Sequence, residues 1–279
     1  DKVVSLVASK DLFKFWPEPS FHDMVFFFAA AITMMLGSIP QQDVFQRVMS
    51  ANSVNAATKG PVIGGVCYIL FAFVPMFLVA SALIIMPEQT AELLKDDPQK
   101  VLPTLVMEKM PFAMQVLFFG ALLSAIKSTA SATLLAPSVT FTENIWRQFR
   151  PRVSDRQELR TMRITVLVFS CFVLAYAIYM QGTSIYEMVS GAYQVTLVGA
   201  FVPLVMGLYW KRASTQGAIL SIVLGIGVWL GFIVSPLGTT FPAQLAGVLA
   251  SFAGMLVGTL APQVIHNQHM AHRKIPHVA

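Results

Sequence analysis

Charged side chains are scarce in this sequence: 12% of its 279 residues are Asp, Glu, Lys or Arg, whereas soluble domains carry about 25%. Hydrophobic residues make up 56% of the chain, and several of their runs approach or exceed the roughly 20 residues that cross a bilayer. This composition excludes an ordinary soluble domain and indicates a polytopic membrane protein. The pI near 9.3 does not indicate a nucleic-acid partner, because the basic residues are confined to short loops between apolar runs.

Cysteine is also rare, and Cys67 and Cys171 both lie inside apolar runs. We expect them to pack, because neither a disulfide framework nor a metal-ligand spacing is present. The C-terminal histidines have basic neighbours and no cysteine nearby, which favours a solvated tail over a metal cluster: His266, His269, His272 and His277. No signal peptide is visible and the chain opens on Asp1, so we expect a fragment that lacks its N-terminal part.

Strand-length alternation is missing too, which leaves helices as the way to cross lipid. Seven helical spans are predicted, at residues 22–46, 61–87, 112–146, 161–181, 185–210, 215–236 and 241–262. The third is long, about 50 Å at 1.5 Å per residue, so it should project past the membrane or bend near Pro137. Segment 1–21 is predicted to be an extracytoplasmic loop with an interfacial helix.

The loop charges separate into two sets on alternate sides of the seven spans. One set of loops holds 12 of the 19 basic residues: Arg47, Lys59, Arg147, Arg150, Arg152, Arg156, Arg160, Arg163, Lys211, Arg212, Arg273 and Lys274. The other set mixes six lysines with acidic residues. The positive-inside rule puts the first set in the cytoplasm, with residue 1 outside and the tail 263–279 inside. We expect a bacterial inner (plasma) membrane.

A polar break interrupts the first span at "MMLGSIPQQDVFQR". Gly37, Ser38 and Pro40 fall in mid-membrane, and three polar residues follow them: Gln41, Gln42 and Asp43. Proline removes a backbone donor, and a broken helix persists in a membrane where its freed backbone faces protein or a water-filled cavity. Transporters bind substrates at such breaks. The alternative is an inert proline kink, which would not need two glutamines and an aspartate.

Hydroxyls mark the third span, in "LLSAIKSTAS". At about 100° per residue, Ala125, Ser128 and Thr129 share one face with further alanines. A sodium ion could take the two hydroxyls and the carbonyl of Ala125 as oxygen ligands. The alternative is that both hydroxyls bond to carbonyls four residues earlier in their own helix.

The chain resembles the sodium:solute symporter family over nearly its full length. The resemblance rests on "GSIPQQDVFQRVMSANS", "LSAIKSTASATLLAPSVTFTENIW", "MRITVLVFS" and "VPLVMGLYWKRASTQGA", which occur in the family's order and spacing. It implies an all-α leucine-transporter-type core of two inverted five-helix repeats. Residues 22–210 would be the second repeat and 211–262 two peripheral helices. The first repeat, which completes both sites, would be a missing N-terminal half of the same transporter.

The resemblance also implies site residues. Ala125, Ser128 and Thr129 match the family's sodium pattern, and the broken helix would contact the solute. The chain looks somewhat like the choline-transporter branch in "IPQQDVFQRVMSA" and "MRITVLVF". That branch has a tryptophan of an aromatic cage where Gln41 stands, so the solute is expected to be polar rather than choline. In the fifth span, Tyr193 and Gln194 are further substrate candidates.

Lys127 departs from the family pattern, which has an apolar residue there. It lies about 200° from Ala125 around the helix, so it points away from the predicted ion. An intramembrane charge usually has a partner and a function, and Glu187 or an acid of the missing half could pair with it. The alternative is a lysine that extends along the helix to water.

Three function classes follow. The favoured one is sodium-coupled symport of a small polar organic solute by alternating access, in the lipid bilayer, with sodium as the ion and no catalytic residues. The second is a symporter-like sensor module. The third is a membrane enzyme, for which no nucleophile–base group or phosphate loop is visible. A proton-coupled or sodium-independent permease, with Lys127 in place of the ion, also remains open.

Overall fold

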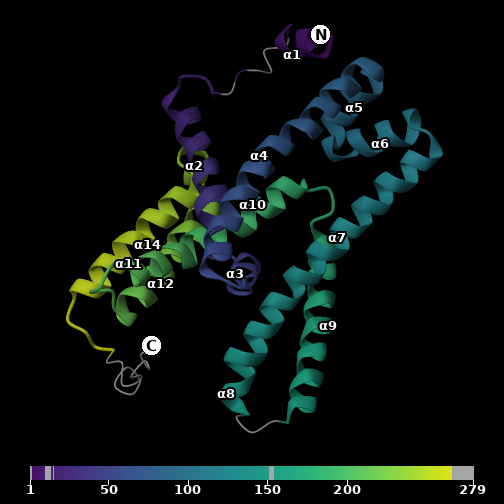
Figure 1. The fold of residues 1–279 in the computed structure, drawn as a ribbon. Coiled ribbons are helices and arrows are strands. Elements are labelled where there is room, and N and C mark those ends of the chain that lie inside the picture. Colours follow the sequence, from purple (N-terminus) through teal and green to yellow (C-terminus); the bar gives the residue numbers. More distant parts are fainter. Residues whose placement is uncertain (1, 10–13, 15, 151–153, 266–279) are drawn as a thin grey trace. The chain divides into compact units, whose positions relative to one another are not determined.

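The structure is a computed structural model that describes residues 2–9, 14, 16–150 and 154–265 of the chain (Figure 1). All regular structure in these residues is helical, as predicted. Within the described residues, six helices are long and apolar enough to cross a membrane, and a seventh apolar helix is shorter. The four predicted tail histidines, His266, His269, His272 and His277, lie outside the described residues.

The six long helices follow the predicted spans closely, and two of them contain a π-helical turn. They are α4 (Val54–Ile85), α7 (Phe112–Thr140) continued by η2 (Phe141–Trp146) and α8 (Arg147–Phe149), α9 (Asp155–Tyr179), α10 (Ile185–Thr196) continued by η3 (Leu197–Phe201) and α11 (Val202–Tyr209), α12 (Thr215–Val234) and α14 (Ala243–Leu260). Pro137 lies inside α7, and the π-helix η2 begins four residues after it, where the N–H of Phe141 bonds to the carbonyls of Pro137 and Ser138. The predicted bend near Pro137 stays a prediction.

The predicted span 22–46 is two helices. Helix α2 (Phe21–Gly37) has 17 residues, a turn covers residues 38–40, and α3 (Gln42–Met49) follows. Pro40 has no N–H, and proline disfavours a helical conformation in the residue before it. Ser20 caps the start of α2 by accepting a hydrogen bond from the N–H of Asp23.

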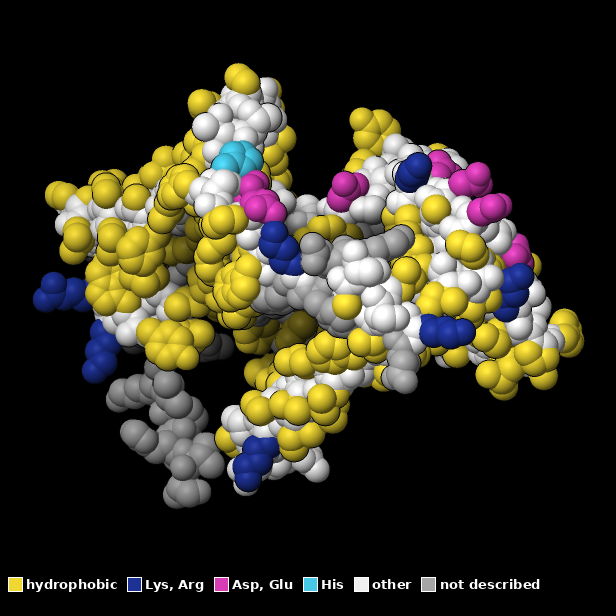
Figure 2. Space-filling model, turned by 90° about the horizontal axis from the view of Figure 1, so that it is seen from above, with side chains coloured by type: hydrophobic (Ala, Val, Ile, Leu, Met, Phe, Trp, Pro, Cys, Tyr) yellow, Lys and Arg dark blue, Asp and Glu magenta, His cyan; other side chains and the backbone are white. Residues whose placement is uncertain are grey.

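The chain divides into two compact units. The first comprises residues 1–15 and 42–185. Its small buried core lies where α4 meets α5 (Pro87–Asp96) and α6 (Val101–Lys109), and it contains Ala82, Met86, Val101 and Leu105. Most of α4, α7 and α9 is exposed and apolar, as expected of helices that meet lipid or further helices. Hydrophobic side chains also cover much of the face in Figure 2.

The basic end of the α7–α9 pair, within the first unit, is held by charges. Arg147 Nη1 lies 2.6 Å from Glu143 Oε2 and 3.7 Å from Glu158 Oε1, which joins η2 and α8 to α9. Cys67 and Cys171 are free and exposed, so the expectation that they pack within this chain is wrong for the described residues.

The second unit comprises residues 16–41 and 186–279, and the hairpin of α12 and α14 is its best-packed part. Gly254 and Gly258 form a GxxxG pattern on α14, and the two helices approach closely there: a Cβ on Gly258 would lie 2.7 Å from the Cα of Gly217. The buried hydroxyls of Ser221 and Ser251 are hydrogen-bonded at 2.8 Å across this interface. Small residues of this kind let membrane helices approach closely.

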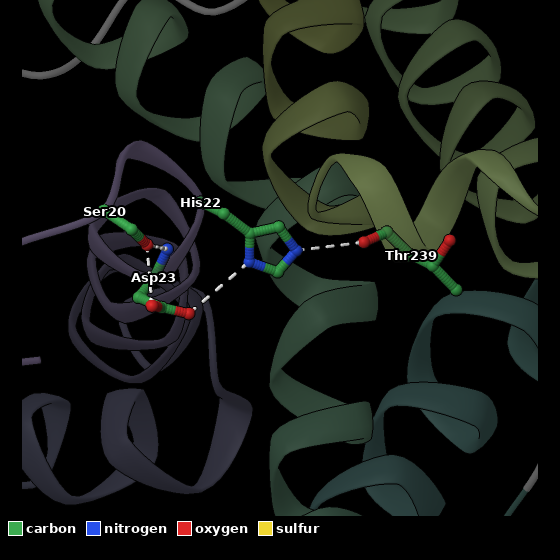
Figure 3. Close-up of polar contacts among 4 residues, drawn as sticks. All are labelled: Ser20, His22, Asp23 and Thr239. Carbon is green, nitrogen blue, oxygen red and sulfur yellow. Dashed lines mark hydrogen bonds and ion pairs between the residues drawn. The ribbon is translucent and has the colours of Figure 1, made fainter. Parts of the chain in front are cut away.

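The start of α2 is attached to the short helix α13 (Leu237–Thr240) through His22 (Figure 3). His22 Nε2 lies 3.1 Å from the carbonyl oxygen of Thr239, and the ring stacks on Phe26 with centroids 4.4 Å apart. His22 Nδ1 is 3.6 Å from a carboxylate oxygen of Asp23. These contacts fix one end of α2, and the break lies at its other end.

The division into an extracytoplasmic segment, a five-helix repeat at 22–210, two peripheral helices and a cytoplasmic tail stays a prediction.

Candidate functional site

A polar cluster surrounds the end of α2, where the helix breaks. The hydroxyl of Thr196, the last residue of α10, lies 2.7 Å from the carbonyl oxygen of Gly37 and 3.0 Å from that of Tyr193. It also accepts a hydrogen bond from Gln41 Nε2 at 3.3 Å. The carbonyl that the break frees is therefore satisfied by a side chain of a second helix, as buried backbone groups in a membrane require.

Gly37 lets these two helices meet. It is buried, and a Cβ at this position would collide with the carbonyl oxygen of Tyr193. The π-helix η3 begins directly after Thr196, and its first residues, Leu197 and Val198, are fully buried. Single-turn π-helices are frequent at functional sites.

Gln194, one half-turn before Thr196, is held by another helix. Trp229 Nε1 of α12 donates a hydrogen bond of 3.0 Å to Gln194 Oε1. Both side chains are half-buried. Of the substrate candidates from the sequence, the structure thus brings together Gly37, Gln41, Tyr193 and Gln194 in one unit.

The remaining substrate candidates do not take part in the hydrogen bonds of this cluster. The hydroxyl of Ser38 donates to the carbonyl of Met35 at 2.9 Å and so belongs to the end of α2. Gln42 is exposed at the start of α3. Asp43 lies in the same helix, and its side chain is outside what the structure describes. Both residues of α3 fall in the first unit.

The predicted sodium ligands lie together on α7. Ala125, Ser128 and Thr129 are all exposed on this helix of the first unit. Further along α7, Thr133 and Ser138 donate their hydroxyls to carbonyls four residues earlier, at 2.9 and 2.7 Å. Among the described residues, the hydroxyls of Ser128 and Thr129 have no hydrogen-bond partner. The alternative, in which both hydroxyls bond to carbonyls four residues earlier, is therefore not seen in the part of the chain that the structure describes, and their lone pairs are free to accept a cation.

Lys127 lies between these residues in the sequence and is exposed on the same helix. Within the described part of the chain it forms no ion pair. The predicted pairing with an acid therefore has no support from the described residues. Glu187 belongs to the second unit, so its relation to Lys127 stays open.

Two residues of the cluster were missed by sequence reasoning. Thr196 carries a signal that could have found it, because it is a hydroxyl in an apolar span, two positions after Gln194. Trp229 carries none: an indole in the sixth span resembles any other apolar side chain until its neighbour across the helix interface is known.

The comparisons with known proteins now decide the family. The sequence profile of the sodium:solute symporter family matches residues 4–225. The chain belongs to this family. As a member of this family with six long apolar helices among its described residues, it is an integral membrane protein.

Named relatives of this family member act on different solutes. The sodium/mannose cotransporter SLC5A10 of Bos taurus is 26% identical over 212 residues, which are 67% of this chain and 34% of the relative. The sodium/myo-inositol cotransporter 2 of Sus scrofa is 23% identical over 234 residues, 78% of this chain and 35% of the relative. The high affinity choline transporter 1 of Mus musculus is 27% identical over 201 residues, 70% and 34% respectively. The chain thus spans about a third of the length of these relatives.

Proposed function

We propose that this chain is part of a sodium-coupled symporter, which moves a small polar organic solute across a membrane by alternating access. The observation that carries the proposal is the broken helix α2, whose freed Gly37 carbonyl is bound by Thr196 beside Gln41. Broken helices with polar side chains line the substrate and ion sites of many transporters. Family membership makes a solute and a coupling ion the expected occupants.

The solute is proposed to contact the polar cluster at the end of α2. Gln41, Tyr193 and Gln194 supply an amide, a phenol and a second amide, with Gly37 and Ser38 as backbone neighbours. Gln42 and Asp43 are further candidates. This set fits a hydroxylated or carboxylated solute better than a quaternary amine, which requires aromatic faces.

Sodium is proposed as the coupling ion, bound by the carbonyl of Ala125 and the hydroxyls of Ser128 and Thr129. The free hydroxyls support this assignment. Three oxygens are too few for a desolvated cation, so the remaining ligands would come from helices beyond those described. We place those helices in an N-terminal half of the same transporter, because the chain spans a third of its relatives.

A second candidate function rests on Lys127. A lysine in an apolar helix, without an ion pair among the described residues, could supply the positive charge that sodium otherwise brings. Transport would then be sodium-independent or proton-coupled. The basic loops are proposed to face the cytoplasm of a bacterial inner (plasma) membrane in either case.

The test uses the complete transporter in proteoliposomes. Radiolabelled D-mannose, D-glucose, myo-inositol and choline are offered with an inward sodium gradient, with a proton gradient alone, and with N-methyl-D-glucamine in place of sodium. We expect sodium to drive uptake of a hydroxylated solute, and protons to have no effect. Sodium should also raise the melting temperature of the purified protein over N-methyl-D-glucamine, because a bound ion stabilises the folded state. Proton-driven uptake would favour the Lys127 alternative, and indifference to both ions would favour a sensor.

A further inference from the structure

Trp229 touches the proposed solute site from a helix that the family resemblance treats as peripheral. It lies on α12, and its indole N–H donates to Gln194 Oε1 of α10 at 3.0 Å. Helix α14 packs closely behind it: a Cβ on Gly247 would lie 2.9 Å from the Cβ of Trp229. A larger residue than glycine at 247 would push α12, and the indole with it, out of place.

The hydrogen bond decides which way the amide of Gln194 faces. An indole N–H can only donate, so its partner on the glutamine must be the oxygen. The amide nitrogen, with its two N–H donors, is left on the other side. Among the described residues no hydrogen bond engages Gln194 Nε2.

We propose that Trp229 is a positioning residue, which fixes the amide of Gln194 so that its N–H donors face the solute. The proposal rests on the proposed function of the Gln194 cluster as a solute site. Without Trp229 the amide can turn over and present its oxygen, which repels the acceptor oxygens of a hydroxyl or carboxylate. The peripheral helix α12 thereby takes part in solute recognition without touching the solute.

The first experiment tests the contact alone and needs no solute. The complete transporter is labelled with ¹⁵N-tryptophan in detergent micelles, and Trp229→Phe assigns the indole resonance of Trp229. We expect Gln194→Leu to shift this resonance, because the acceptor is lost, and Gln194→Glu to keep it hydrogen-bonded. Val195→Ala, an exposed neighbour, is the control and should leave it unchanged. The proposal is overturned if the chemical shift of the Trp229 indole N–H does not change in Gln194→Leu.

The second experiment tests positioning. Uptake of the solute found in the four-compound panel is measured in proteoliposomes. Trp229→Phe keeps a ring and removes the N–H, and it should raise the half-saturating solute concentration about tenfold with the maximal rate little changed. Trp210→Phe is the matched control, because its indole makes no hydrogen bond within the described residues.

A double variant separates positioning from general packing. If Trp229 acts through Gln194, Trp229→Phe should add little to the effect of Gln194→Leu, because interacting residues are not additive. Full additivity, or an equal effect of the Trp210→Phe control, overturns the proposal. If no panel solute is taken up with sodium, the proposed function has failed for these solutes, and the indole resonance alone decides whether Trp229 fixes the amide.

Discussion

The hydroxyl of Thr196 serves three neighbours with one proton and two lone pairs. It can donate to Gly37 or Tyr193 at any moment and accepts from Gln41. Thr196→Val keeps the shape of the side chain and removes all three contacts. Side-chain hydrogen bonds between membrane helices are worth about 0.6 kcal/mol on average and about 1.7 at most. We expect the half-saturating solute concentration to rise by about three- to seventeenfold, measured by uptake, and Val195→Ala should leave it unchanged. An unchanged value would move the solute away from the break.

The free hydroxyls of α7 lead to a prediction about sodium. Under the proposed assignment, Ser128→Ala or Thr129→Ala would remove one oxygen ligand that the other ligands could not easily replace. The sodium activation curve of uptake should shift to at least about tenfold higher concentration, the equivalent of 1.4 kcal/mol. Ser131→Ala is the control, because this serine lies about 240° from Ala125 around the helix. Unchanged sodium activation in both variants would show that the hydroxyls bind no ion.

The positive charge of Lys127 should repel a sodium ion bound nearby on α7. At an effective dielectric of about 20, a charge roughly 8 Å away costs a bound cation about 2 kcal/mol, or roughly thirtyfold in affinity. A charged lysine is tolerable beside sodium only if it is paired or remote. We expect Lys127→Met to impair transport while sodium dependence stays measurable. Wild-type uptake in this variant would indicate a lysine that only extends to water.

At the scale of the helices, α2 and α10 can cross this closely because residue 37 is a glycine, which has no side chain. A Cβ on Gly37 would strike the carbonyl of Tyr193, so Gly37→Ala must push the two helices apart. Overpacking of this kind costs about 1–3 kcal/mol. The melting temperature of the purified transporter should fall and uptake should drop, whereas Gly207→Ala has open space around its Cβ and should leave both unchanged. Equal effects of the two variants would contradict the assigned crossing.

The helices themselves were predictable, because lipid permits little else and the apolar runs are long. The end of α2 was predictable as a break from Pro40 and the polar triplet behind it. The π-helices were not, since one extra residue in a turn leaves no mark in a hydrophobic run. The partner of Gln194 was also invisible, because the sequence does not say which face of α12 meets α10.

At the scale of the whole molecule, the charge pattern predicts an orientation that labelling can check. With Cys67 and Cys171 replaced by serine, a single cysteine is placed at Glu92 in α5 or at Arg156 in α9. A membrane-impermeant maleimide should label Glu92→Cys in intact cells, and Arg156→Cys only after permeabilisation, because basic loops face the cytoplasm. The reverse pattern would invert the topology, and labelling of both in intact cells would put them on the same side.

The proposed sodium site rests on a sequence pattern that the structure does not test for ion binding. Ala125, Ser128 and Thr129 were recognisable by their spacing, since a helix places residues three and four apart on one face. Their free hydroxyls depend on rotamers, which no sequence pattern records. Further oxygen ligands of the proposed site would have to come from other helices, and this chain spans about a third of the length of its relatives.

The π-helix η3 affects how the helix responds when a residue is deleted from the sequence. A π-helical turn holds one residue more than an α-helical turn, so an α-helical turn with one residue fewer at Leu197–Phe201 would leave α10 and α11 with nearly the same faces. A one-residue deletion within α10 or α11 themselves would instead rotate everything beyond it by about 100°. A single deletion should therefore be better tolerated within η3 than within the α-helices on either side. Genetic selection for tolerated one-residue deletions would reveal the turn without any structure at all.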